Sequence, residues 1–278
     1  MSVASVAKAQ PALSIEHVAV HFGGLIAISD MTFTVNEGEV VSLIGPNGAG
    51  KTTAFNIVTG FLRPTKGTVH YRGAPLTDLK PHEVASRGLV RTFQRTSVFQ
   101  SVNVFENVMI GLHRRGRSRL WDTLLALPRE KASERELRTR ASEILAMVGI
   151  EHRARDLAGS LAYGDQRLLG VAMALAADPS MLLLDEPVSG MNATETARFM
   201  ELLARLRGLG MTILLVEHDM PMVMGVSDRI VVLNYGRIIA EGPPAAIQGN
   251  PEVIRAYLGE GVKKRARGSR SRLPLRQG

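Results

Sequence analysis

The stretch 45–53, with the sequence GPNGAGKTT, limits the possible fold more than any other part of the chain. Gly45, Gly50, Lys51 and Thr52 fit the pattern G-x-x-x-x-G-K-[ST], and the stretch lies between the apolar run EVVSLI and the helix-like run AFNIVTGFL. Glycines have no Cβ atom, so the backbone can curl round a phosphate with its N–H groups inward, and a helix beginning at Lys51 adds the positive end of its dipole. The pattern therefore predicts a phosphate-binding loop in which Lys51 reaches the β- and γ-phosphates and Thr52 offers its hydroxyl to Mg²⁺.

Apolar runs on both sides of this loop predict the fold class. EVVSLIG, MLLLDE and MTILLVEH are short, aliphatic and bounded by Gly, Pro or charge, which is typical of buried parallel strands. Helical patterns alternate with these runs, and this order predicts an α/β core with a parallel sheet. The segment LSIEHVAVHFGGLIAISDMTFTVNEGEV alternates as antiparallel strands do, with turns at Gly23–Gly24 and Asn36–Gly38. We therefore expect an antiparallel β layer at the N-terminal end of the domain.

The region between about 95 and 167 has a helical character and predicts a helical subdomain inserted in the core. Ser133 and Glu136 form a capping-box pattern, which predicts a helix that begins near Ser133. The apolar residues that share one face of this expected helix are Leu137, Ala141, Ile144, Leu145 and Val148.

The composition of the chain indicates the cellular compartment in which it functions. The 278 residues include no cysteine, which excludes disulfides and thiolate metal sites. The N-terminal MSVASVAKAQPA has no apolar core of signal-peptide length, and the run LLGVAMALAA is shorter than the roughly 18 residues that a membrane span needs. We expect a flexible N-terminal segment at 1–11 and a soluble, intracellular chain.

The net charge of +8 is concentrated at the C-terminal end. The segment 261–278, GVKKRARGSRSRLPLRQG, holds seven basic and no acidic residues, which leaves 27 basic against 26 acidic residues in the rest of the chain. We expect 260–278 to be a basic, disordered tail, either a solvated extension or a contact for anionic lipid headgroups. The nearly neutral body does not favour a specific nucleic-acid partner.

Two carboxylates at the end of the run MLLLDE predict the rest of the chemistry. Asp185 ends an expected buried strand, where a protein with a phosphate-binding loop supplies a second metal ligand. Glu186 follows directly and is placed to accept a proton from a water that attacks the γ-phosphate. His218, at the end of TILLVEH, could donate a hydrogen bond to the same phosphate, although a single histidine at a strand end is more often structural.

Taken together, residues 12–259 resemble the ATP-binding subunits of ABC transporters. RTFQ resembles the Q-loop of that family with Gln94 as its glutamine, and LAYGDQ (161–166) resembles its signature motif. SGMN (189–192) resembles the D-loop, and His218 lies where the family has its switch histidine. The signature motif is the most specific of these, because other proteins with a phosphate-binding loop lack it.

The resemblance implies a set of site residues around ATP and Mg²⁺. Phe22 lies where family members carry the aromatic residue that stacks on adenine. The catalytic residues implied are Lys51, Gln94, Glu186 and His218; the metal ligands are Thr52, Gln94 and Asp185; the ATP-binding residues are Phe22, Gly45, Pro46, Asn47, Gly48, Ala49, Gly50, Lys51, Thr52 and Thr53; and the signature residues that act on the ATP of another subunit are Leu161, Ala162, Tyr163, Gly164, Asp165 and Gln166.

Within the family, the amino-acid sequences of several stretches are similar to those of the ATP-binding subunits of branched-chain amino acid importers, the LivG type. These stretches are GPNGAGKTTAFNIVTGF, GLVRTFQRTSVFQSVNVFENVMIGLH, LAYGDQ and AIQGNPEVIRAYLGE. Ala162 departs from the general pattern, in which a serine hydroxyl helps to bind the γ-phosphate across the dimer. The N–H of Gly164 and the dipole of a helix that begins at Asp165 are then expected to carry more of that contact.

The resemblance also implies partners and a location. ATP on the loop of one subunit would be completed by the signature motif of a second ATPase subunit, with a heterodimer favoured over a homodimer. Membrane permease subunits would receive the motion through the helical insert, with Gln94 at its hinge, and an extracytoplasmic solute-binding protein would take part indirectly. The chain is expected at the cytoplasmic face of the inner (plasma) membrane, as a peripheral subunit.

Three alternatives stay open from the sequence. The ATPase subunit of a lipopolysaccharide exporter shares the single-domain layout and a similar ending. A soluble ABC ATPase acting on nucleic acid would be expected to have a long coiled coil or tandem ATPase units, and a nucleotide-binding module without turnover would be expected to lack Glu186.

Overall fold

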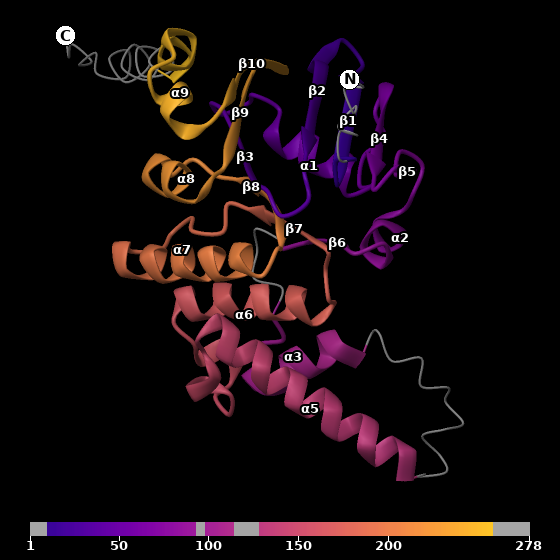
Figure 1. Cartoon of the computed structure of the whole chain (residues 1–278), viewed down its shortest axis with the longest axis vertical. Helices are drawn as coiled ribbons and strands as arrows, with labels where there is room; N and C mark the ends of the chain where they lie inside the picture. The colour runs from indigo at the N-terminus through magenta and orange to yellow at the C-terminus, as the bar shows by residue number, and fades with distance from the viewer. Residues whose placement is uncertain (1–9, 93–97, 114–127, 258–278) are drawn as a thin grey trace, which may run out of the picture.

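The computed structural model describes residues 10–92, 98–113 and 128–257 (Figure 1). Gln94, residues 1–9 of the N-terminal segment and residues 258–278, which include the basic tail, lie outside the described residues. The predicted α/β class is confirmed, because one sheet joins an antiparallel part to a parallel part and helices pack on both.

Ten strands form this sheet in the order β5-β4-β1-β2-β10-β9-β3-β8-β7-β6. The strands β9, β3, β8, β7 and β6 run parallel to one another and form the core, while β5, β4, β1 and β2 form the expected antiparallel layer. The C-terminal strand β10 joins the two parts, since it pairs antiparallel with β9 and parallel with β2. The strand bounds are β1 (Leu13–Phe22), β2 (Leu25–Val35), β3 (Val40–Ile44), β4 (Lys66–Tyr71), β5 (Ala74–Pro75), β6 (Leu89–Arg91), β7 (Met181–Asp185), β8 (Thr212–Val216), β9 (Arg229–Asn234) and β10 (Arg237–Gly242).

Helices α3, α5 and α6 form a separate layer below the sheet in Figure 1, and α7 and α8 lie between this layer and α9. Helix α5 begins at Pro128, so the helix start expected near Ser133 is wrong. Proline fits the first turn of a helix because the N–H that it lacks would have no partner inside the helix there. The bounds are α1 (Lys51–Val58), α2 (Pro81–Ser86), α3 (Val104–His113), α5 (Pro128–Val148), η1 (Glu151–Arg153), η2 (Ala158–Ser160), α6 (Tyr163–Ala176), α7 (Ala193–Gly208), α8 (Met220–Val226) and α9 (Pro244–Gln248).

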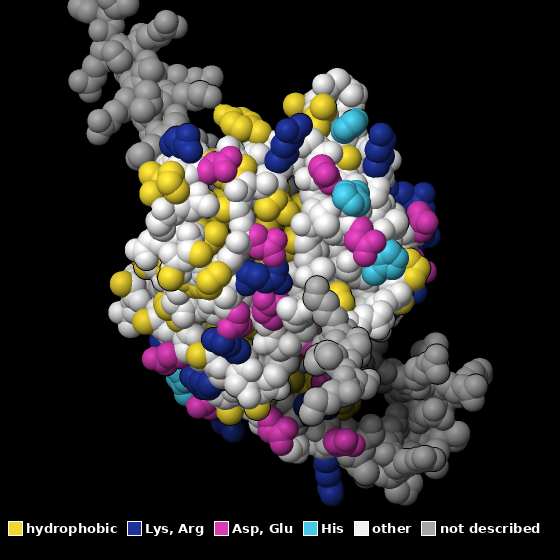
Figure 2. Space-filling model, turned by 45° about the horizontal axis from the view of Figure 1, so that its top comes forward, with side chains coloured by type: hydrophobic (Ala, Val, Ile, Leu, Met, Phe, Trp, Pro, Cys, Tyr) yellow, Lys and Arg dark blue, Asp and Glu magenta, His cyan; other side chains and the backbone are white. Residues whose placement is uncertain are grey.

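The surface carries charges of both signs. In the face shown in Figure 2, Lys and Arg side chains lie interspersed with Asp and Glu side chains. A protein that binds a nucleic-acid backbone presents basic side chains gathered on one face, and the part of the surface drawn in colour in this view does not have that pattern.

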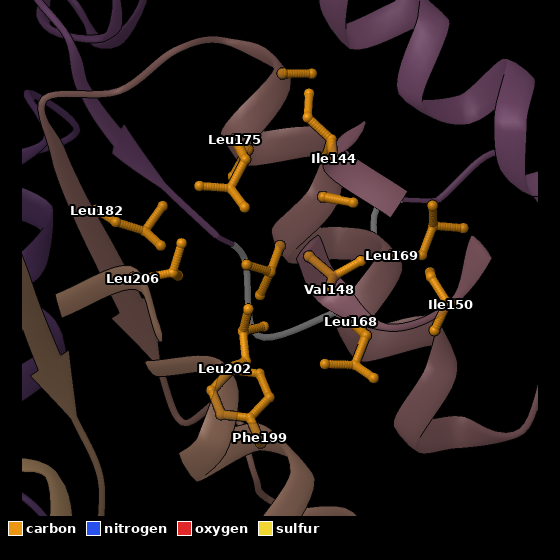
Figure 3. Packing of buried hydrophobic residues seen from close by; sticks show 14 of the residues in the cluster. Ile144, Val148, Ile150, Leu168, Leu169, Leu175, Leu182, Phe199, Leu202 and Leu206 are labelled. Atoms are coloured by element: carbon orange, nitrogen blue, oxygen red, sulfur yellow. The ribbon is translucent and has the colours of Figure 1, made fainter. Parts of the chain in front are cut away.

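The central strands are buried on both faces, which explains their uninterrupted apolar sequences. All five residues of β3, β7 and β8 are buried. Side chains alternate across a strand, so Leu182 and Leu184 pack in one hydrophobic cluster while Met181 and Leu183 pack in another with residues of α1. Figure 3 shows the first cluster, in which side chains from the sheet, α5, α6 and α7 meet. The apolar face predicted for α5 lies in that cluster, with Ala141, Ile144, Leu145 and Val148 buried and Leu137 partly buried.

Candidate nucleotide site

The phosphate-binding loop connects the end of β3 to the start of α1, as the sequence predicts. Its glycines Gly45, Gly48 and Gly50 have φ angles of 151°, 78° and 108°, which lie in the left-handed region. A Cβ atom on Gly45 would lie 2.0 Å from the carbonyl oxygen of Leu233, and one on Gly50 would lie 2.9 Å from that of Ala27. Both the backbone angle and the lack of space therefore require glycine at the two ends of the loop.

Lys51 is buried at the start of α1, with its ammonium group inside the curve of the loop. Its Nζ donates to the carbonyl oxygens of Gly45 at 2.6 Å and Pro46 at 3.0 Å. Thr52, the next residue, is exposed. The positive charge is thus fixed at the centre of the loop, where phosphate oxygens of a nucleotide would enter, and a hydroxyl group lies at its edge.

Asp185 ends β7 and is buried against a cation that the sequence analysis missed. Arg91, at the end of β6, donates through Nη2 to Oδ2 of Asp185 at 2.6 Å and through Nη1 to Oδ1 of Asn56 in α1 at 2.8 Å. The guanidinium also lies 5.5 Å from the ring centre of Phe55. The sequence contained a signal for this ion pair, since Arg91 directly follows the apolar pair Leu89–Val90. A cation at the end of a buried strand needs an anionic partner nearby.

Glu186 occupies a strained position directly after β7. Its φ angle of 45° is unusual for a residue with a side chain, and its N–H donates to the carbonyl oxygen of Val216 in β8 at 2.8 Å. Such backbone angles persist where the surroundings enforce them, and they cluster at functional sites. The carboxylate is half-buried and follows the end of the parallel strands, the same edge of the sheet as Asp185.

A second residue that the sequence analysis missed is Glu217, whose side chain is fully buried between β8 and His218. Its carboxylate accepts hydrogen bonds from the backbone N–H groups of Val188 at 3.0 Å, His218 at 2.8 Å and Asp219 at 3.2 Å. It therefore joins the segment that follows Glu186 to the segment that carries His218. The ring of His218 is 61% exposed, with Nδ1 3.5 Å from Oε2 of Glu217.

Phe22 ends β1, and its ring is half-exposed. It pairs with Leu25 across the turn to β2, and the next residues of β2 pass beside the loop, since Ala27 lies against Gly50. The turn Tyr235–Gly236 lies at the same place, because the N–H of Gly236 donates to the carbonyl oxygen of Ala49 at 2.9 Å. The β1–β2 hairpin thus lies against the loop, and Phe22 is at the tip of that hairpin.

The signature segment 161–166 lies at the start of α6, away from the loop. Helix α6 begins at Tyr163, two residues before the expected start at Asp165, so Gly164 lies in its first turn. Helix α6 packs against α3 and α5, whereas α1 packs against β2 (Figure 1). Tyr163 is partly exposed and its hydroxyl accepts from Arg167 at 2.7 Å, while its ring lies beside Gly190 of the D-loop segment. Ala162 is the N-cap residue of α6 and supplies no side-chain acceptor. One chain therefore carries the loop and the signature segment on different parts of its surface.

A groove of about 780 Å³ lies between α2, β6, α3 and α6. Phe99 and Ile110 line it with exposed apolar side chains, together with Val90 and Met173. Thr92, which directly precedes the gap that contains Gln94, also lines the groove. Among the helices of the described ranges, none has the length and apolar character needed to cross a membrane.

A glycine loop around a buried lysine, followed by a helix, is found here together with a carboxylate at the end of β7, a parallel strand separated from β3 by β8. This combination defines a P-loop nucleoside triphosphatase. The profile of the ABC transporter family matches residues 28–189, and the profile described as "Branched-chain amino acid ATP-binding cassette transporter" matches residues 237–263. The chain therefore belongs to the ATP-binding cassette family of ABC transporters, as the signature motif predicts.

Curated relatives match nearly the whole chain. It is 45% identical over 252 residues to the high-affinity branched-chain amino acid transport ATP-binding protein LivG of Salmonella typhimurium, covering 90% of this chain and 99% of LivG. It is 43% identical over 252 residues, with the same coverage of both chains, to BraF of Pseudomonas aeruginosa, a protein with the same description. The lipopolysaccharide export ATP-binding protein LptB of Haemophilus influenzae is 32% identical over 251 residues, covering 90% of this chain and 98% of LptB.

Solved structures agree with this assignment. An ATP-binding cassette of an ABC transporter in its ADP conformation has a TM-score of 0.79 and 31% identity, covering 90% of this chain and 99% of that one. A dimeric ATP-binding cassette bound to ADP and Pi has a TM-score of 0.70 and 27% identity, covering 84% and 98%. The fold class, nucleotide binding and ATP hydrolysis expected from the sequence follow from this family membership.

Proposed function

We propose that this chain is the ATP-hydrolysing subunit of an importer for branched-chain amino acids or a related small solute. The single observation that carries the proposal is the loop around Lys51 after β3, with Asp185 and Glu186 at the end of β7 in the same parallel part of the sheet. The direction of transport and the solute class rest on the relatives, because the LivG and BraF matches exceed the LptB match by more than ten percentage points of identity.

We assign the nucleotide contacts as follows. The backbone N–H groups of 45–53 and the ammonium of Lys51 bind the β- and γ-phosphates, and the ring of Phe22 stacks on adenine. Mg²⁺, when bound, would neutralise charge on the phosphates, and the hydroxyl of Thr52 and the carboxylate of Asp185 suit it, because Mg²⁺ prefers oxygen ligands and is usually bound by one or two carboxylates besides phosphates and waters. Gln94 is the third ligand that we propose.

The hydrolytic step needs a base beside the attacking water and a hydrogen-bond donor to an oxygen of the γ-phosphate. Glu186 accepts the proton of the attacking water, and His218 donates a hydrogen bond to a γ-phosphate oxygen. Glu217 supports this arrangement, because its carboxylate fixes the backbone on both sides, at Val188 and at His218. The strained φ angle of Glu186 indicates that the fold holds this side chain at a defined place.

We propose that the site is completed by a second ATPase subunit, a distinct chain rather than a second copy. The signature residues 161–166 lie apart from the loop in one chain, so they can act on a nucleotide only across a dimer interface. The N–H of Gly164 and the dipole of α6 would face the γ-phosphate of the partner, since Ala162 offers no hydroxyl. The dimeric cassette among the structural neighbours supports this arrangement.

We further propose that the groove between α2, β6, α3 and α6 receives a helical segment of a membrane permease. Its exposed apolar side chains Phe99 and Ile110 suit a helix laid in a groove, and β6 leads from it to Gln94. An ATPase docked there would lie at the cytoplasmic face of the inner membrane, with a solute-binding protein on the other side.

We also propose that the ATP-binding domain comprises residues 12–259, with a helical subdomain at about 95–167.

The test is uptake of radiolabelled leucine by cells that lack this chain and carry either the parent gene or a Lys51→Ala copy. We expect uptake with the parent copy and none with Lys51→Ala, while uptake of an unrelated sugar stays equal. If leucine, urea and amide uptake all stay normal without the chain, the importer assignment is wrong. A defect in lipopolysaccharide export in the same cells would favour the exporter instead.

A further inference from the structure

The start of α6, which carries the signature segment, is bonded to the start of α7, which follows the D-loop segment 189–192. The backbone N–H of Gly164 donates to Oε1 of Glu195 at 3.2 Å. On the same side, Nη1 of Arg198 lies 3.2 Å from Oδ1 of Asp165. The two segments expected to face another ATPase subunit are therefore connected to each other within this chain.

Glu195 is fixed in position by the helix to which it belongs. Its Oε2 accepts from the N–H of Asn192 at 2.9 Å, and Oδ1 of Asn192 accepts from the N–H of Glu195 at 3.0 Å, which forms a capping box at the start of α7. The other oxygen, Oε1, is left to face α6, where the N-cap residue Ala162 supplies no side-chain acceptor. One carboxylate thus caps two helices.

Close approach of this carboxylate depends on the glycine. A Cβ atom on Gly164 would lie 2.6 Å from Oε1 and 2.8 Å from Cδ of Glu195. Any side chain at this position would push Glu195 away. Gly164 therefore gives the carboxylate access to the N–H group that a bound phosphate would need.

We infer that Glu195 is a latch on the signature segment, a positioning residue that has to release the N–H of Gly164 before two ATPase subunits can close on ATP. This inference rests on the proposed contact between Gly164 and the γ-phosphate of the partner subunit's ATP. An N–H group carries one hydrogen, and a carboxylate and a γ-phosphate are both anionic acceptors, so the two compete for it and repel each other. Because Ala162 has no hydroxyl group, the N–H of Gly164 makes a larger share of the contact between the signature segment and the γ-phosphate. Release of this N–H from Glu195 therefore sets the ATP concentration that is needed for the two subunits to close.

The first measurement is amide hydrogen exchange of Gly164 in the purified, nucleotide-free chain. We expect exchange about tenfold faster in Glu195→Ala than in the parent, as for the loss of one hydrogen bond. Glu201→Ala is the control, because Glu201 lies exposed on the same helix. Equal exchange rates at Gly164 in the parent and in Glu195→Ala would overturn the latch.

The second measurement is the ATP dependence of hydrolysis by the transporter purified from membranes through a tag on this chain. Glu195→Gln keeps a capping box, because glutamine also serves at that position, and it removes the charge that opposes the phosphate. We expect the ATP concentration for half-maximal hydrolysis to fall about fivefold or more with no loss of maximal rate, and to stay unchanged in Glu201→Gln. A residue with only a structural role would not lower that concentration.

An unchanged or raised half-saturating concentration in Glu195→Gln, with a parent complex that hydrolyses ATP, would overturn the latch and leave the proposed function standing. A parent chain that purifies without a second ATPase and without permeases would contradict the proposed function itself, and the latch with it.

Discussion

The guanidinium of Arg91 lies 2.6 Å from the carboxylate of Asp185, and both side chains are at least nine-tenths buried. Arg91 ends β6 three residues before Gln94, and Asp185 ends the neighbouring parallel strand β7. Arg91 also donates to Asn56 of α1, the helix that follows the phosphate-binding loop. The same guanidinium therefore connects α1 to Asp185, the proposed metal ligand, and Arg91 itself belongs to the segment that leads to Gln94. A displacement of Asp185 would therefore also displace Arg91, which is the first residue of the stretch RTFQ that resembles the Q-loop.

Arg91→Met should destabilise the fold by about 3–5 kcal/mol, because it leaves the carboxylate of Asp185 buried without its cation. Urea unfolding of the purified chain measures this. The control is Arg63→Met, which breaks the exposed pair Arg63–Asp78 and should change the free energy of unfolding by about 1 kcal/mol or less. Similar small effects of both substitutions would show that the buried pair contributes no more than an exposed one.

Glu217→Leu should reduce the free energy of unfolding by about 3 kcal/mol or more, since one buried and two part-buried N–H groups lose their acceptor. Glu217→Gln is the milder companion, and it should lower the maximal rate of ATP hydrolysis more than it lowers nucleotide affinity, because it disturbs the backbone at Val188 and His218. Thermal unfolding and phosphate-release assays on the same preparations give both readouts. Parent-like values in Glu217→Leu would rule out the role given to this carboxylate.

Lys51→Ala should weaken ATP binding by about tenfold or more, because it removes the positive charge held inside the loop. A fluorescent ATP analogue titrated into the purified chain measures the affinity. Lys66→Ala, which removes an exposed cation from β4, is the matched control and should bind as the parent does. Unchanged affinity in Lys51→Ala would count against the assignment of the phosphate-binding loop.

The local parts of the site were predictable from the sequence, because each depends on residues close together in the chain. The glycines of 45–50 require a tight loop by their missing Cβ atoms, and the aliphatic runs of β3, β7 and β8 require burial on both faces. These strands and the start of α1 at Lys51 are where the patterns predict them.

The parts that sequence patterns did not predict depend on distant pairing. The strand β10 joins the antiparallel layer to the parallel core through β2, a contact between residues more than 200 positions apart, and local periodicity contains no information about it. Arg91 and Glu217 were missed for the same reason, since their partners Asp185 and Val188 are distant in sequence. The helix start at Pro128 has a local cause instead: the prediction rested on the capping-box pattern at Ser133, whereas a proline fits the first turn of a helix.

The central claim is that Glu186 is the general base of an ATP-hydrolysing site, and the rate of phosphate release by Glu186→Gln tests it most directly. Glutamine keeps the size of the side chain and cannot accept the proton, so we expect the rate to fall by about 10²- to 10⁴-fold while ATP is still bound. The purified transporter complex is the sample, and ATP affinity is measured on the same preparation. Hydrolysis at the parent rate by Glu186→Gln would contradict the account.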